Sequence, residues 1–289
     1  MNPEVLIIGC GFLGEAAAEL FSSRGKRVLG LARSADSVAA LNGRSFGSAV
    51  CDVTDPDSVD ALETKLRGVP LAIYCVSSGR GGADSYAAVY REGLRRVLKS
   101  WMPGKLIFVS STSVYGQTDG SWVTEDSPAL PDRQTGHILL EAERIALQAG
   151  GIVARLSGIY GPGRSVLLRK FLSGEAILEG GGHRWINQIH RDDAALALAC
   201  LGDSPGFTGV YNVTDDVPAT QRNLYGWMAD FLKRPLPPEG PADLNRKRGW
   251  TSKRISNAKL HATGWIPEFP SYRDALPRLT VHKHDSFLE

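Results

Sequence analysis

Three closely spaced glycines near the start of the chain have the spacing of a phosphate-binding loop. They lie in one hexapeptide, Gly9-Cys10-Gly11-Phe12-Leu13-Gly14. The apolar run 5–8 precedes this loop, and a helical pattern over about residues 12–24 follows it. In such a unit, glycines let the backbone turn tightly and approach a pyrophosphate, while the amides at the helix start face its negative charge. This context predicts a dinucleotide site, with a glycine-rich turn that binds nothing as the alternative. The predicted contacts are Gly9, Gly11, Phe12, Leu13 and Gly14.

The segment after the second apolar run, 27–31, bears on which dinucleotide is bound. A site for NAD usually carries Asp or Glu there, about 20 residues after the loop, to bond the ribose hydroxyls. This chain instead has Arg33 and Ser34, which suit the 2′-phosphate of NADP. Asp36 is expected beyond the end of the strand. We therefore predict NADP rather than NAD, with an exposed Arg33 that binds no ligand as the alternative.

Two further strand ends are predicted to contribute to the same site. Asp52 and Val53 follow the third predicted strand, beside the expected adenine, where Asp52 bonds the adenine amino group or caps the next helix. Val76 and Ser77 end the fourth strand, close to the expected nicotinamide ribose. Ligands of open α/β sheets collect at the carboxyl ends of the strands.

A run of hydroxyl side chains follows the fifth predicted strand, 106–109. It reads Ser110-Ser111-Thr112-Ser113, and Val114-Tyr115-Gly116 continues it. A hydroxyl at such a strand end can polarise a substrate carbonyl or hydroxyl group. The alternative is a polar strand end that satisfies its own backbone.

Apolar strands alternate with helical patterns along the chain, which indicates an α/β fold with a doubly wound parallel sheet, a Rossmann core. We predict that residues 1–160 form this core and that 186–215 return to it. Residues 161–185 and 216–289 then form a smaller C-terminal substrate lobe, with the substrate cleft between the two parts. Strands are predicted at 5–8, 27–31, 48–50, 71–76, 106–109 and 152–156, and helices at 12–24, after Asp55-Pro56, and at 86–99, 136–148, 166–171, 192–201, 221–232 and 257–263.

The composition argues against several functional classes. Of 289 residues, 33 are basic and 31 acidic, so no strong field recruits nucleic acid or a membrane. The cluster Arg246-Lys247-Arg248 is interpreted as a solvated surface. Cys10, Cys51, Cys75 and Cys200 match no zinc pattern, so we expect free thiols, no metal and a cytoplasmic protein. No apolar stretch reaches the roughly 18 residues of a membrane span.

Six motifs, in this order, resemble the extended short-chain dehydrogenase/reductase family, which includes nucleotide-sugar epimerases, dehydratases and reductases. The resemblance spans most of the chain and implies a bound nicotinamide dinucleotide. One departure is the glycine loop, because the extended branch usually reads Gly-x-x-Gly-x-x-Gly and Ile8 stands at the first glycine. The motifs lie at Ser110–Gly116, Glu125-Asp126-Ser127-Pro128, 155–163, Ile189-His190-Arg191-Asp192-Asp193-Ala194, Tyr211-Asn212-Val213 and 256–260.

A second departure concerns catalysis. The family uses a Ser and a Tyr-x-x-x-Lys pair, in which Tyr is the acid or base, and a Glu usually follows the Lys by four residues. The aligned Ser is Ser111, and aligning the Glu to Glu143 places Thr135 and Leu139 at the Tyr and Lys positions. The chain therefore resembles the atypical members that lack this pair. Tyr115 and His137 are candidate replacements, with a packed Tyr115 and an exposed or packed His137 as the alternatives.

The later motifs imply a substrate site. Tyr160 and Arg164 align with residues that border the nicotinamide and substrate in relatives. Arg164 or Arg254 is a candidate to hold a substrate phosphate, since Arg recognises such anions by paired hydrogen bonds. His190 and Asp193 are interpreted as scaffold, with Asp193 capping the helix that follows.

Two functions follow from these motifs. The first is an NADP(H)-dependent oxidoreductase or epimerase-like enzyme that acts on a small, nucleotide-linked or otherwise polyhydroxylated substrate. The second is a non-catalytic NADP(H)-binding sensor or scaffold, which the absent Tyr/Lys pair favours. We expect a monomer or a homodimer, because extended relatives often pair through the helices that read 86–99 and 136–148 here.

Overall fold

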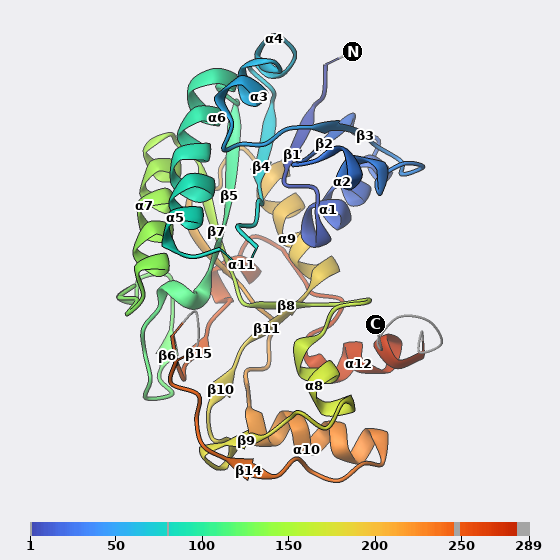
Figure 1. Ribbon diagram of the computed structural model, residues 1–289, viewed down its shortest axis with the longest axis vertical. Helices are drawn as coiled ribbons and strands as arrows, with labels where there is room; N and C mark the ends of the chain where they lie inside the picture. The colour runs from blue at the N-terminus through green and yellow to red at the C-terminus, as the bar shows by residue number, and fades with distance from the viewer. Residues whose placement is uncertain (1, 80, 246–248, 282–289) are drawn as a thin grey trace.

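A seven-stranded parallel sheet lies at the centre of the N-terminal part of the chain (Figure 1). The computed structural model describes residues 2–79, 81–245 and 249–281. The strand order is β12-β7-β5-β4-β1-β2-β3, and the direction of winding reverses beside β1. This order confirms the predicted doubly wound Rossmann architecture. The strands are β1 (Val5–Ile8), β2 (Val28–Ala32), β3 (Gly47–Val50), β4 (Leu71–Tyr74), β5 (Lys105–Ser111), β7 (Ile152–Leu156) and β12 (Gly209–Val213).

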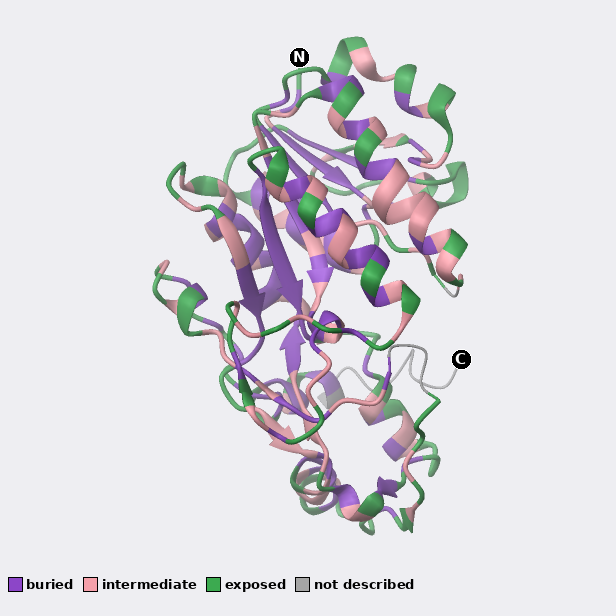
Figure 2. Cartoon of the chain, turned by 90° about the vertical axis from the view of Figure 1, so that its left-hand side faces the viewer, coloured by how far each residue is buried: buried purple, intermediate pink, exposed green. Residues whose placement is uncertain are grey.

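Helices cover both faces of the sheet. On one face, α1 (Phe12–Ser23) and α9 (Arg191–Asp203) pack together over the strands. On the other face lie α6 (Gly93–Trp101) and α7 (Gln134–Gln148). Figure 2 shows the central strands buried between helices whose outer sides are exposed. Burial on both faces explains why these strands read as continuous apolar runs.

The shorter connections follow local sequence signals. The helix α3 (Pro56–Asp60) follows Asp55-Pro56 as predicted, and Asp55 caps it by accepting a hydrogen bond from the amide of Asp57 at 3.1 Å. Pro56 occupies the first turn, where its missing N–H costs nothing. The remaining short helices of this part are α2 (Ala35–Ala39), α3 (Pro56–Asp60), α4 (Glu63–Leu66), α5 (Ala83–Tyr86), η1 (Ala87–Glu92) and η2 (Thr112–Val114).

The C-terminal lobe has an apolar cluster of its own, below the sheet in Figure 1. Its helices are α8 (Val166–Leu172), α10 (Gln221–Leu232) and α12 (Tyr272–Val281), and the rings of Phe171 and Tyr225 stack at 5.9 Å between them. Four two-stranded pairs and two further short helices complete the described fold: β6 (Trp122–Val123) with β15 (Arg254–Ile255), β8 (Gly158–Tyr160) with β11 (Gln188–His190), β9 (Leu178–Glu179) with β14 (Glu239–Gly240), β10 (Trp185–Ile186) with β13 (Ala219–Thr220), η3 (Gly180–Gly182) and α11 (Ala258–His261). Of these, β6, β15 and α11 pack against the cores of the central sheet, through Val123, Ile255 and Leu260.

The helix predicted at 86–99 is three consecutive segments. α5 leads into the π-helical turn η1, and α6 follows. The Tyr74 hydroxyl donates to the carbonyl of Val89 at 2.5 Å, inside the π-helical turn. A Cβ at Gly93 would stand 2.7 Å from the same hydroxyl, so the helix approaches β4 closely there. Apolar periodicity carries no signal for this turn.

The prediction that Asp193 caps α9 was wrong. The cap is His190, whose Nδ1 accepts a hydrogen bond from the amide of Asp192 at 3.3 Å. Asp193 is buried and accepts from the amides of Glu268 and Phe269 at 2.6 and 3.0 Å. Burial raises the pKa of Asp193 to about 6. Its role is to tie the C-terminal segment to α9, which is still a scaffold role.

Two further predictions concern the surface. None of the helices in the described part of the chain is long and apolar enough to cross a bilayer. The predicted solvated cluster Arg246-Lys247-Arg248 lies outside the described residues.

Candidate functional site

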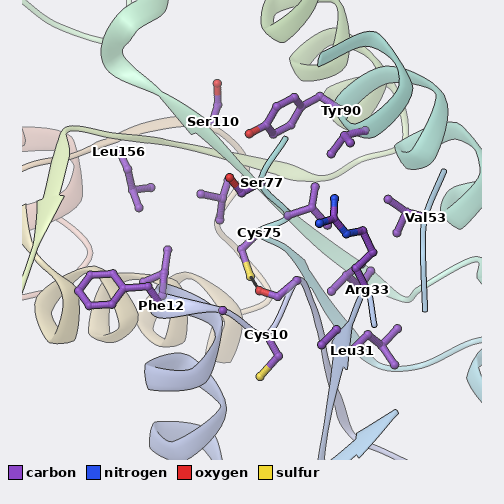
Figure 3. A pocket seen from close by; sticks show the side chains of 18 of the residues that line it. Cys10, Phe12, Leu31, Arg33, Val53, Cys75, Ser77, Tyr90, Ser110 and Leu156 are labelled. Atoms are coloured by element: carbon purple, nitrogen blue, oxygen red, sulfur yellow. Dashed lines mark hydrogen bonds between the residues drawn. The ribbon is translucent and has the colours of Figure 1, made fainter. Parts of the chain in front are cut away.

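One cavity of about 430 Å³ opens at the carboxyl ends of the central strands (Figure 3). It runs from β2 and β3, past the glycine loop, to the ends of β5 and β7. This is the edge at which doubly wound folds bind dinucleotides. The predicted residues that line the cavity are Gly9, Gly11, Phe12, Leu13, Arg33, Asp52, Val53, Val76, Ser77, Ser111, Leu139 and Arg164.

The three glycines of the loop have different structural roles. Gly9 has φ +95°, and a Cβ there would stand 2.6 Å from the backbone Cα of Val76. A Cβ at Gly14 would stand 2.4 Å from the carbonyl oxygen of Gly9, so Gly14 lets α1 pack against the loop and does not line the cavity. Gly11 lines the cavity, and a Cβ there would contact no protein atom within 4 Å. The open space beside Gly11 is where a pyrophosphate would approach the backbone.

At the β2 end of the cavity, Arg33 is exposed and lines the wall. The Ser34 hydroxyl caps α2 by accepting from the amide of Ser37 at 3.3 Å, and it lies outside the lining. The side chain of Asp52 accepts from the amide and hydroxyl of Thr54 at 2.9 and 2.7 Å. Asp36 lies on α2, beyond the strand, as expected. At the end of β2 itself, the described residues therefore present Arg33 to the cavity and not a carboxylate.

At the β5 end, the two serines have different environments. The Ser110 hydroxyl donates to Glu143 Oε1 at 2.5 Å and is buried. Both serines line the cavity, and the Ser111 Oγ accepts a hydrogen bond from the amide of Ser113 at 3.2 Å. Since that bond uses the oxygen as an acceptor, the Ser111 hydroxyl proton is left to donate to a ligand.

A buried ion pair supports this end of the cavity. Arg155, on β7, donates to both carboxylate oxygens of Glu143, with Nη2 to Oε2 at 2.6 Å. The guanidinium carbon of Arg155 also lies 4.8 Å from the ring centre of Tyr115. The Tyr115 hydroxyl donates to Asn212 Oδ1 at 2.9 Å. This network joins β5, α7, β7 and β12. It gives a structural role to four of the motif residues, Ser110, Tyr115, Arg155 and Asn212.

The candidate proton-transfer residues differ in whether they line the cavity. Leu139 lines the cavity, whereas Thr135 is half-buried and does not. His137 is exposed. Tyr115 is buried outside the lining, and burial raises its pKa. None of these four residues reaches the cavity with a titratable group.

The candidate substrate residues also differ in whether they line the cavity. Arg164 lines the cavity, with its guanidinium carbon 5.0 Å from the ring centre of Phe12. Tyr160 packs against the rings of His190 and Tyr272, and burial raises its pKa. Arg254 lies between Trp122 and Trp185, at 5.1 and 5.0 Å from their ring centres. Neither Tyr160 nor Arg254 lines the cavity.

Further residues line the cavity, and sequence reasoning did not assign Tyr86 and Tyr90 to it. The Cys75 thiol donates to the carbonyl oxygen of Gly9 at 3.3 Å, and burial raises its pKa. The four cysteines of the chain are free thiols. Tyr86 and Tyr90 reach the cavity from α5 and η1. Their spacing of four residues was the available signal, because residues four apart share one helix face.

Residues 5–214 match the model of the NAD dependent epimerase/dehydratase family. The chain belongs to this family. The protein YeeZ of Escherichia coli (strain K12) is 30% identical over 238 residues, which cover 79% of this chain and 84% of YeeZ. A 3-diazoavenalumate denitrifying reductase of Streptomyces is 32% identical over 53% of this chain and 58% of its own. A solved structure from Methylobacillus flagellatus, named after the same family, has a TM-score of 0.80 at 31% identity and covers 97% of this chain and 98% of its own.

Proposed function

We propose that this chain is an NADP(H)-dependent oxidoreductase of the short-chain dehydrogenase/reductase type, with nucleotide-linked or other polyhydroxylated compounds as its substrate class. The observation that carries the proposal is the single cavity that joins the glycine loop, Arg33 and Ser111. The name of the matched family and the reductase among the relatives favour a nicotinamide cofactor and redox chemistry.

The residues of the cavity have separate tasks in this proposal. Amides from Gly11 to Leu13 hold the pyrophosphate, and Arg33 holds the 2′-phosphate. The Ser111 hydroxyl donates to the substrate oxygen and so orients the carbon that accepts or loses hydride. Arg164, at the opposite rim, holds an anionic group of the substrate. When bound, the cofactor supplies the hydride chemistry.

Replacing Arg33 tests the choice of cofactor. We expect Arg33→Ser to weaken NADPH binding by about 10- to 100-fold, because a charged hydrogen bond is worth about 1.5–3 kcal/mol. NADH binding should change by less than about threefold. Arg44→Ser is the control, since Arg44 is an exposed, ion-paired arginine outside the cavity. Equal losses of NADPH and NADH affinity in Arg33→Ser would contradict the assignment.

Replacing Ser111 tests whether its hydroxyl takes part in the proposed reaction. We expect Ser111→Ala to lower the rate of NADPH oxidation with a responsive ketone by about 10²–10³-fold while cofactor affinity is retained. Substrates are found by screening nucleotide-linked ketones and free ketones with the wild-type protein. Ser113→Ala is the matched control, because its amide remains and its side chain does not line the cavity. An unchanged rate in Ser111→Ala would show that the hydroxyl has no part in the reaction.

A second function is favoured by one specific observation. Leu139 faces the cavity at the position of the family's lysine, and the aligned Thr135 does not line it. A protein that binds NADP(H) without turnover, as a sensor or scaffold, would need neither residue. A partner protein that one redox state of the cofactor releases, together with no hydride transfer to any tested ketone, would decide for the sensor.

A further inference from the structure

The reaction proposed above needs a proton donor, and none of the aligned candidates supplies one. Leu139 lines the cavity without an ionisable group. His137 is exposed, while Tyr115 and Tyr160 are buried outside the lining. Among the described residues that line the cavity, the phenols are Tyr86 and Tyr90.

Tyr90 is held by ring contacts beside β5, the strand that ends at Ser111. Its ring meets that of Phe108 edge-on, at 6.5 Å and 84°. Phe108 is on β5, which ends at Ser111. On the other side, the ring of Tyr86 lies 5.0 Å away. In Figure 3 the hydroxyl of Tyr90 points toward the side of the cavity where Ser77 and Ser110 lie.

The backbone that carries Tyr90 is unusual. η1 is a π-helical turn, and such turns are rare and frequently found at functional sites. The bond from Tyr74 to the carbonyl of Val89 joins this turn to β4. Val89 and Tyr90 both line the cavity from it. Tyr86 is almost fully buried, whereas Tyr90 is half-buried and so more open to a ligand.

We propose that Tyr90 is the proton donor of this site, in place of the family's tyrosine, whose aligned position here is Thr135 on α7. The proposal rests on the proposed function. In the reduction of a ketone, the carbonyl carbon gains a hydride with its electron pair, which the reduced nicotinamide supplies. The carbonyl oxygen takes the proton of the Tyr90 hydroxyl as that O–H bond breaks, and water reprotonates the phenolate. A phenol hydroxyl carries the proton that the reducing direction requires.

Fluorine NMR tests the placement without turnover. The protein is labelled with meta-fluorotyrosine, and the Tyr90 signal is the one that Tyr90→Phe removes. We expect NADP⁺ to shift this signal and 2′-phospho-ADP-ribose, which lacks nicotinamide, to leave it in place. Equal shifts with both ligands would overturn the proposal, because Tyr90 would then lie away from the nicotinamide. If neither ligand moved any tyrosine signal, cofactor binding itself would be contradicted, and the proposed function would fail first.

Kinetics test the chemical role. We expect Tyr90→Phe to lower kcat for ketone reduction by about 10²–10⁴-fold, the usual contribution of general acid catalysis, with NADPH affinity within about threefold of wild type. Phe keeps the ring contacts with Tyr86 and Phe108. Tyr211→Phe is the control, since Tyr211 is a buried phenol of β12 outside the cavity. A Tyr90→Phe variant with the wild-type kcat would overturn the proposal, even where Ser111→Ala is inactive.

Discussion

Replacing Glu143 by glutamine is expected to lower the free energy of unfolding by about 3–5 kcal/mol, because the buried charge of Arg155 loses its counter-ion. The two side chains are 3% and 7% exposed, so water cannot compensate the remaining charge. The Ser110 hydroxyl also loses a charged acceptor. Chemical denaturation of the apo protein, followed by tryptophan fluorescence, measures the change.

Glu141 provides a matched control on the same helix. It pairs with Arg91 at 2.7 Å, but the two side chains are 40% and 31% exposed. Exposed pairs contribute about 0–1 kcal/mol, so Glu141→Gln should change stability little. The double variant Glu143→Met with Arg155→Met removes both charges and should recover much of the loss. Equal effects of Glu143→Gln and Glu141→Gln would contradict the assigned role of burial.

Replacing Gly11 by alanine is expected to weaken cofactor binding by more than about tenfold while the apo protein stays folded. The new Cβ meets no protein atom within 4 Å, so it occupies the space of the ligand. Gly9→Ala should instead destabilise the protein itself. There the Cβ meets the backbone of Val76, and φ is +95°. Thermal unfolding and cofactor titration of both variants separate the two effects.

This pair of variants also distinguishes a binding loop from a structural one. If the glycine loop only shaped the turn, Gly11→Ala would retain cofactor binding. If Gly11→Ala instead unfolded the apo protein as Gly9→Ala does, the open space beside Gly11 would be filled by protein in solution. Either result would contradict the reading of Gly11 as the point of closest approach to the pyrophosphate.

The sheet could be predicted from the sequence because parallel strands buried on both faces leave unbroken apolar runs. The glycine loop was predictable for a related reason, since Gly9 and Gly14 are required by backbone contacts that no larger residue permits. Residues whose roles depend on their sequence neighbours, such as the helix cap Asp55, could be predicted equally well. The placements of Arg33 and Ser111 followed from their positions at strand ends.

The rest depended on contacts between distant segments. Arg254 lies between Trp122 and Trp185, and nothing near Arg254 in the sequence indicates either ring. Asp193 sits beside a predicted helix start, yet its partners lie about 75 residues further on. The position of Tyr90 depends on a π-helical turn, which α-helical periodicity does not reveal. The sequence therefore predicted the residues of the glycine-loop end of the cavity better than Tyr86 and Tyr90.

The measurement that tests the central claim most directly is a paired titration of the purified protein with NADPH and NADH, followed by tryptophan fluorescence. The cavity with the glycine loop and Arg33 predicts saturable binding of both, with NADPH bound at least about tenfold more tightly. Tighter binding of NADH would contradict the role of Arg33. Binding of neither would contradict the assignment of this cavity to a nicotinamide dinucleotide.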